Sequence, residues 1–237
     1  MDPFNLPPVA AILELAYSGL LGLSNLLTPL AGVTASALAI VLVTILVRLI
    51  LIPVGVSQTK AQWTQRRLAP RLGEIRKRYA KKPELLQKKT MELYKEEGAS
   101  PFAGMLPALA QAPFVSIVYA LFIRAEVDGH GNALLTDTLA GVPLGTGLFG
   151  VTAWQGFVVF GVILLVSAVT AWFSRRSMLA LQLPDQPNAG LTRAMSWLSF
   201  VPVIIAAFVP LAAALYVVVS SLWALGERAV LRRIYWK

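Results

Sequence analysis

The sequence contains no cysteine and a single histidine, His130, among its 237 residues. Without cysteine the chain has no disulfides, no thiolate metal ligands, no thiol nucleophile and no lipidated cysteine. It also has no HExxH pattern, no Ser-His arrangement, no glycine-rich phosphate loop and no pair of aspartates in an apolar segment. We therefore expect no enzymatic activity, no cofactor and no bound metal.

Charge is scarce as well: 14% of the residues are charged, 57% are hydrophobic, and the mean hydropathy is +0.67. These values are typical of a polytopic membrane protein and exclude a soluble domain. The net charge of +9 is concentrated, because more than half of the Lys and Arg residues lie between Lys60 and Lys95. Cytoplasmic segments collect Lys and Arg, so we interpret this region as cytoplasmic. A nucleic-acid contact is the alternative, but we expect no specific nucleic-acid recognition.

The N-terminal sequence MDPFNLPPVA has neither the basic start of a secretory signal nor the arginines of a transit peptide. We therefore expect the plasma (inner) membrane of a bacterium as the location. Several windows of this sequence contain almost no ionisable residues, and each is long enough to cross about 30 Å of hydrocarbon. The last apolar stretch, from Ala194 to Gly226, is too long for one span and has basic residues on both flanks. It is predicted to cross twice, with the turn at Pro210.

The sequence thus predicts an all-α membrane protein with five spans, its N-terminus outside and its C-terminus inside. A helix at 8–27 is expected to lie on the outer leaflet as an interfacial amphipathic helix, and a sixth span is the alternative. The predicted segments, in chain order, are an extracytoplasmic N-terminal segment (1–34), a first span (35–56), a cytoplasmic helical hairpin (57–101), a second span (102–123), an extracytoplasmic loop (124–152), a third span (153–173), a cytoplasmic loop (174–193), a fourth span (194–209), a fifth span (211–226) and a short basic cytoplasmic tail (227–237).

The predicted hairpin has two helical patterns. Leu72, Ile75 and Tyr79 follow helical spacing, and Pro83 begins a second pattern in which Leu93 and Tyr94 share a face, together with Leu86. The apolar stripes are thin, so we expect weak packing and high mobility relative to the bundle. A solvated loop that only fixes topology is the alternative, although it does not explain the two patterns.

Arg48 is the exceptional residue, because it interrupts the otherwise uncharged first span. An arginine near the centre of a membrane helix is disfavoured by roughly 2.5 to 3.5 kcal/mol, so such a residue usually faces a polar cavity or a partner. No Asp or Glu lies in any predicted span. The alternative is that the side chain reaches the cytoplasmic headgroups, which lie roughly 12 Å away along the helix. That alternative becomes more favourable if Pro53 ends the helix early.

Several motifs resemble the YidC-type membrane insertase family, whose relatives include the Oxa and Alb insertases of organelles. The first motifs are an arginine in the first span and a hairpin ending in LYKEEG. A group of prolines with a glycine and a glutamine follows the hairpin, and two prolines and a tyrosine lie near the C-terminus. The marker residues are Arg48, Pro101, Gly104, Pro107, Gln111, Pro113, Pro202, Pro210 and Tyr216. The resemblance covers nearly the whole chain and is closest to the short bacterial members. Some members have a long basic tail or a lipobox cysteine, and this sequence has neither.

The resemblance implies an insertase and chaperone for small membrane proteins. Family members form a hydrophilic groove open to the cytoplasm and to lipid, in which the arginine attracts the polar or acidic extracellular segment of a substrate. The groove residues predicted here are Arg48, Thr44, Gln111, Tyr216, Ser220 and Trp197. For Trp197 the alternative is an interfacial anchor, for Gln111 a hydrogen bond between helices, and for Thr44 a bond to its own helix.

The implied partners are newly made membrane proteins and the lipid bilayer, and contacts with the Sec translocon and the ribosome stay open. A small-anion transporter or channel, in which Arg48 binds the anion, is a rival function. It favours inverted repeats, and no internal repeat is present. A structural assembly factor for other membrane proteins is a second rival.

Overall fold

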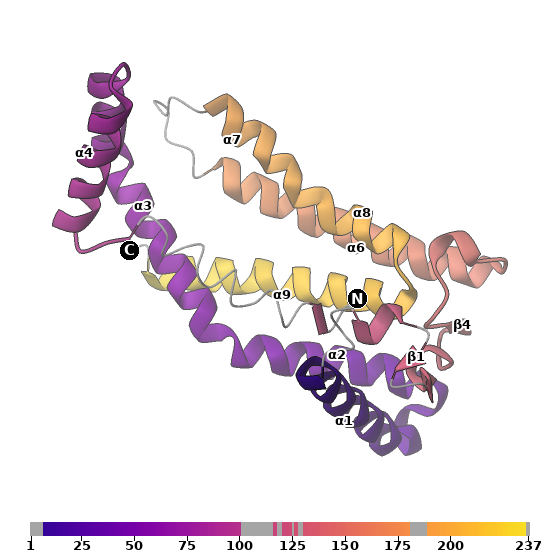
Figure 1. The fold of residues 1–237 in the computed structure, drawn as a ribbon. Coiled ribbons are helices and arrows are strands. Elements are labelled where there is room, and N and C mark those ends of the chain that lie inside the picture. The colour runs from indigo at the N-terminus through magenta and orange to yellow at the C-terminus, as the bar shows by residue number, and fades with distance from the viewer. Residues whose placement is uncertain are drawn as a thin grey trace.

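The computed structural model describes residues 7–100, 116–117, 120–124, 126–127, 130–180 and 189–235. Long helices run side by side in a bundle, and a pair of helices leaves one end of it (Figure 1). The all-α class is confirmed. Most of the predicted second span, 102–123, and Gln111 within it lie outside the described residues. The elements are α1 (Pro7–Ala31), η2 (Gly32–Thr34), α2 (Ala35–Ile50), α3 (Ile52–Tyr79), α4 (Pro83–Glu96), β1 (Glu126–Val127), β2 (His130–Gly131), η3 (Ala133–Leu135), β3 (Thr138–Leu139), β4 (Val142–Pro143), η4 (Leu148–Gly150), α6 (Trp154–Leu179), α7 (Ala189–Met195), η5 (Ser196–Phe200), α8 (Val201–Phe208) and α9 (Leu211–Tyr235).

Three helical segments of the described chain are long and apolar enough to cross a membrane: Ala10–Ile50, Trp154–Leu179 and Leu211–Tyr235. A shorter apolar helix covers Arg193–Phe208. The first segment contains both α1 and α2, which turn back and pack on each other after Gly32, a glycine with a φ of 54° that other residues rarely adopt. A membrane protein is thus confirmed, whereas the count of five spans stays a prediction.

Prolines mark two of the helix boundaries. α2 ends at Ile50 and α3 begins at Ile52, with Pro53 in the first turn of α3, where its missing N–H leaves no hydrogen bond unmade. α8 and α9 are separated by an extended residue, Val209, followed by Pro210. α9 then continues to Tyr235, past the predicted end of the fifth span, because the residues after Gly226 favour a helix and include no proline.

The short strands and turns that precede α6 in the chain close one end of the bundle. The sequence predicted only a loop here, but the structure contains two short antiparallel hairpins, β1 with β2 and β3 with β4. Leu134, Leu144 and Leu211 are fully buried at this end. The first backbone N–H groups of α9 donate to loop carbonyls: Leu211 N–H to Thr146 O at 2.9 Å and Ala212 N–H to Leu144 O at 2.9 Å. These bonds satisfy helix-end donors that otherwise lack partners.

The hairpin of α3 and α4 extends from the opposite end of the bundle (Figure 1). α4 begins at Pro83, with the acidic Glu84 in its first turn. Leu68, Leu93 and Tyr94 form a small buried cluster of its own, against which Leu72 and Ile75 pack. Ion pairs between α3 and Glu97, the residue that follows α4, supplement this cluster. They join Arg67 to Glu97 at 2.8 Å and Arg71 to the same carboxylate at 2.6 Å.

Candidate functional site

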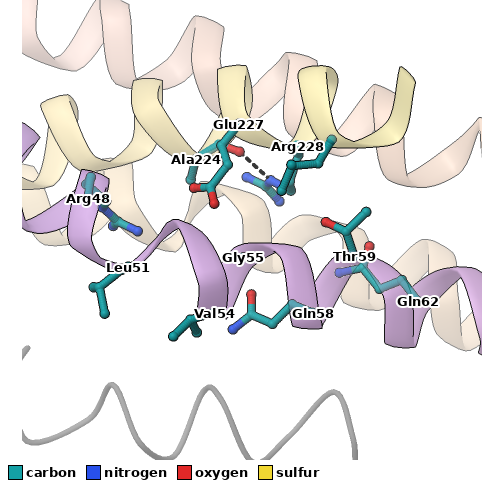
Figure 2. Close-up of a pocket in the computed structure, with 11 residues that line it drawn as sticks. Arg48, Leu51, Val54, Gly55, Gln58, Thr59, Gln62, Ala224, Glu227 and Arg228 are labelled. Carbon is teal, nitrogen blue, oxygen red and sulfur yellow. Dashed lines mark hydrogen bonds between the residues drawn. The ribbon is translucent and has the colours of Figure 1, made fainter. Parts of the chain in front are cut away.

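Arg48 lies in the last turn of α2 and faces a cavity of about 290 Å³ between α2, α3 and α9. Figure 2 shows Arg48 and Glu227 extending into this space from the purple and the yellow helix. We call it the Arg48 cavity, and its polar lining consists of Arg48, Gln58, Thr59, Gln62, Glu227 and Arg228. The ion pairs among the described residues all lie in the hairpin, so no carboxylate of the described part is paired with Arg48.

Glu227 brings a carboxylate into the Arg48 cavity. Its Oε2 accepts a hydrogen bond from Trp223 Nε1 at 3.1 Å, while its buried Oε1 has no hydrogen-bond partner in the described part of the chain. That Oε1 occupies the space that a β-carbon on Gly55 would take. On the other side of the cavity, Arg228 Nε donates a hydrogen bond to the carbonyl oxygen of Ala224 at 2.8 Å (Figure 2). The cavity therefore holds two guanidinium groups and one carboxylate.

Arg48 also lines a second cavity, of about 230 Å³, which we call the serine-lined cavity. Its walls come from α2, α6, η5, α8 and α9, and its hydroxyl groups belong to Ser167, Thr170, Ser174, Ser199, Ser220 and Ser221. The hydroxyls of Ser167 and Ser220 are buried and have no hydrogen-bond partner among the described residues. Buried hydroxyls without partners are rare in proteins, so their presence beside a cavity indicates a place for polar guests.

A third cavity, of about 390 Å³, lies between α3, α6 and α9 and is lined by three arginines, Arg66, Arg228 and Arg232. Arg228 lines all three cavities. The three spaces thus meet around one side chain of α9. They belong to the part of the bundle from which the hairpin leaves, whereas the packed strands and turns of 130–151 cover the opposite end (Figure 1).

Two of the predicted groove residues, Arg48 and Ser220, come together at the serine-lined cavity. Thr44, one turn before Arg48, is buried, and its hydroxyl donates a hydrogen bond to Ile40 O at 2.6 Å. This bond to its own helix is the alternative that the sequence left open for Thr44. Thr44 lines none of the three cavities. Gln111 lies outside the described residues.

The two predicted aromatic residues lie elsewhere. The Tyr216 ring packs against Phe122, with centroids 6.3 Å apart, in the main apolar core. Trp197 is 60% exposed and stacks on the Arg175 guanidinium at 4.4 Å from its ring centroid. This position is typical of the interfacial anchor considered as its alternative. Neither residue lines the three cavities.

Sequence reasoning missed the polar face of α6 and the carboxylate of α9. Ser167, Thr170 and Ser174 recur at helical spacing within an otherwise apolar span, and this stripe is a signal that the sequence offers. Glu227 was placed in the C-terminal tail, since a charged residue after an apolar window normally marks the end of a span. Its place in the cavity depends on α9 continuing as a helix.

Apolar helices of membrane-crossing length around polar cavities that share a lining residue define a helical, multi-pass membrane protein with a polar interior on one side. A family model described as 60Kd inner membrane protein matches residues 27–237. Because the match covers most of the chain, the chain belongs to this family. Its location is the bacterial inner membrane.

Individual relatives agree with the family match. The chain is 40% identical over 114 residues to the membrane protein insertase YidC of Oceanobacillus iheyensis, a match covering 45% of each chain. It is 32% identical over 136 residues to YidC of Clostridium perfringens, covering 57% of each. Membrane protein insertase MisCA of Bacillus subtilis is 25% identical over 217 residues, or 89% of this chain and 76% of the relative. The chain spans about half the length of the first two relatives. The resemblance to the YidC-type family is thereby confirmed.

Proposed function

We propose that this protein inserts small proteins into the bacterial inner membrane and assists their folding, with the Arg48 and serine-lined cavities as the groove that receives them. Five spans, with the N-terminus outside and the C-terminus inside, place the basic hairpin in the cytoplasm. The observation that carries the proposal is that Arg48 lines two polar cavities at once, both on the hairpin side of the bundle.

The position of Arg48 explains how a cation is tolerated within a span. Hydroxyl groups of α6 and α9 and the glutamines of α3 surround the cavities that it faces. Water entering from the hairpin side hydrates the guanidinium and the unpartnered hydroxyls of Ser167 and Ser220. The desolvation that makes an arginine unfavourable in lipid is thereby reduced, while the low dielectric around the cavity keeps its field strong.

The same arrangement acts on a client protein, by which we mean a newly made membrane protein with a polar or acidic extracellular segment. Arg48 and Arg228 attract that segment into the cavities, and Glu227 limits the attraction by offsetting one positive charge. The client's apolar segment meanwhile enters the surrounding lipid, and its burial supplies the free energy at about 25 cal/mol per Å². No nucleotide is required for this step. The packed outer end, around Leu134 and Leu144, separates the cavities from the outside.

Reconstitution of the purified chain into liposomes tests this proposal. The client is a short single-span protein with an acidic N-terminal tail, and insertion is measured as protection of the tail from added protease. We expect insertion with the native chain, strong impairment with Arg48→Ala and largely retained insertion with Arg48→Lys. Arg76→Ala, which removes an exposed arginine from the hairpin, is the matched control and is expected to insert normally.

The outcomes separate the rival functions. Unchanged insertion with Arg48→Ala would contradict the electrostatic role. Anion flux through the liposomes without client insertion would identify a transporter or channel instead. Because the assay contains neither ribosomes nor the Sec translocon, insertion in it shows that neither partner is required. Addition of each partner then measures whether it accelerates the reaction.

A further inference from the structure

The cavity lined by Arg66, Arg228 and Arg232 is distinct in its charge, and we call it the three-arginine cavity. None of the described residues lining it is acidic, and its other polar residues are Gln62, Gln65, Ser174, Ser177 and Ser199. It is also the largest of the three cavities, at about 390 Å³. The Arg48 cavity, by contrast, includes the carboxylate of Glu227. Three like charges around one space favour an anion with several acceptor oxygens.

Two of the arginines are held in position by α6. Arg228 and Arg232 lie one turn apart on α9, and they reach two serines of the neighbouring helix. Arg228 Nη2 donates to Ser174 Oγ at 3.5 Å, and Arg232 Nη1 donates to Ser177 Oγ. Arg66 approaches from α3. The guanidinium groups of Arg228 and Arg232 are therefore held by bonds between α9 and α6. Such preorganisation reduces the entropy lost when a ligand binds.

The level of the cavity relative to the bilayer is marked by aromatic side chains on the same end of the bundle. Trp172 and Trp197 are 46% and 60% exposed, and each stacks on an arginine, Arg176 at 5.3 Å and Arg175 at 4.4 Å from the ring centroid. Exposed tryptophans beside arginines are typical of the boundary between hydrocarbon and headgroups. Ser174 and Ser177, which line the cavity, lie within one turn of this pair of arginines on α6.

We propose that the three-arginine cavity binds the phosphate of an anionic phospholipid headgroup from the cytoplasmic leaflet. Guanidinium groups bind phosphate oxygens through paired hydrogen bonds, and serine hydroxyls donate to the remaining oxygens. A headgroup at the interface is present at high local concentration, unlike free phosphate. The inference rests on the orientation proposed above, with this end in the cytoplasm, but it does not depend on insertase activity. A bound lipid here would also contact Arg228, the side chain shared with the Arg48 cavity.

Native mass spectrometry of the detergent-purified full chain tests the proposal without any client protein. The probes are phosphatidylglycerol and phosphatidylcholine with identical acyl chains, and the readout is the fraction of protein that retains lipid. The test variant is Arg66→Gln with Arg232→Gln, which leaves Arg228 in place. The matched control is Arg76→Gln with Arg78→Gln, which removes the same charge from exposed positions of the hairpin.

The native chain and the control are expected to retain phosphatidylglycerol in preference to phosphatidylcholine. The test variant is expected to lose that preference, with affinity for phosphatidylglycerol reduced by about tenfold or more. If the double variant does not fold, the single variants Arg66→Gln and Arg66→Lys replace it, and the first is expected to lose more of the preference than the second.

Three results would overturn the proposal. The first is an equal loss of preference in the test and control variants, which would identify a general charge effect. The second is displacement of the lipid by millimolar inorganic phosphate, which would identify a free-phosphate site. The third is retention of an acidic client-tail peptide with no preference between the two lipids, which would assign the cavity to clients. Because insertion is measured separately, failure here leaves the proposed function standing, and failure of insertion leaves this site testable.

Discussion

Glu227 of α9 and Gly55 of α3 fit together, because the Oε1 atom of Glu227 occupies the space that a β-carbon at residue 55 would take. The close approach brings the carboxylate into the cavity that Arg48 and Arg228 also line. It also explains why a glycine is found early in a helix that otherwise leaves the membrane bundle. The carboxylate offsets part of the positive charge that Arg48 and Arg228 bring to the cavity.

Substitution of Gly55 by alanine is therefore expected to stabilise the protein less than the same substitution elsewhere in α3. Alanine in place of glycine within a helix normally adds about 0.5 to 1 kcal/mol to the free energy of unfolding. At residue 55 the new methyl group also requires the end of the Glu227 side chain to move away. Denaturant unfolding in detergent measures the change. Gly73→Ala is the matched control, since nothing lies near that position and alanine favours a helix. Equal gains in the two variants would contradict the contact, and adding Glu227→Ala to Gly55→Ala is expected to remove the difference.

Glu227→Gln is expected to increase insertion of clients with acidic tails by a few fold. The substitution keeps the acceptor for Trp223 but removes the negative charge that offsets Arg48 and Arg228. Insertion of a client with a neutral tail should be unchanged. The protease-protection assay with both clients measures the ratio. Glu74→Gln, on an exposed position of the hairpin, is the control, and the same increase in that variant would show a general effect of charge.

Two buried serines, Ser36 and Ser167, are expected to differ in what their substitution does to stability. Ser36 bonds to Ser24 at 2.9 Å and donates to Asp137 Oδ2 at 2.6 Å, so Ser36→Ala is expected to lower the free energy of unfolding by about 1 to 3 kcal/mol. Ser167→Ala removes a hydroxyl that has no partner in the described part of the chain, so stability should be unchanged or higher. A larger loss with Ser167→Ala than with Ser36→Ala would contradict this assignment.

The hairpin contains an ion pair that alters two pKa values. The Nζ of Lys89 lies 2.6 Å from Glu92 Oε2, and this hydrogen bond raises the pKa of Lys89 and lowers the pKa of Glu92. The pair stabilises the helix above the ordinary Glu pKa of 4.5 and below the ordinary Lys pKa of 10.5. The contribution is lost as pH falls through the lowered pKa of Glu92 or rises through the raised pKa of Lys89.

An NMR titration of the Glu92 carboxyl group in the full chain measures this effect. The pKa of Glu92 should rise toward its ordinary value in Lys89→Ala. Lys81→Ala, which removes an exposed lysine from the turn before α4, is the control and should leave the Glu92 titration unchanged. An identical titration in the native chain and Lys89→Ala would show that the pair does not form in solution.

The sequence predicted the features that depend on local chemistry. Arg48 was recognisable because a cation in an uncharged span needs an explanation, and the boundary at Pro210 followed from a backbone that cannot donate. The sequence could not show which polar residues gather around Arg48, since that depends on how α2, α6 and α9 are rotated against one another. Glu227 is the clearest case, because only the helical continuation of α9 and the absence of a side chain at Gly55 bring its carboxylate into the cavity.

Thr44 shows what helical spacing alone does not determine. One helical turn separates it from Arg48, and this spacing predicted that both would line the groove. The structure directs the Thr44 hydroxyl to its own backbone, as threonines in apolar helices often do. The polar stripe of Ser167, Thr170 and Ser174 lines the serine-lined cavity, from a helix distant in the sequence.

The central claim is that the polar cavities beside Arg48 are reached by water from the hairpin side and closed from the outer side. Because the chain has no cysteine, Ser221→Cys introduces a single thiol into the serine-lined cavity. In oriented membranes, a membrane-impermeant maleimide should label this thiol from the cytoplasmic side only, and an acidic client tail should slow the labelling. Labelling from the outer side would contradict the account. So would no labelling from either side, provided that the control variant Arg76→Cys, with its thiol at an exposed hairpin position, reacts fully.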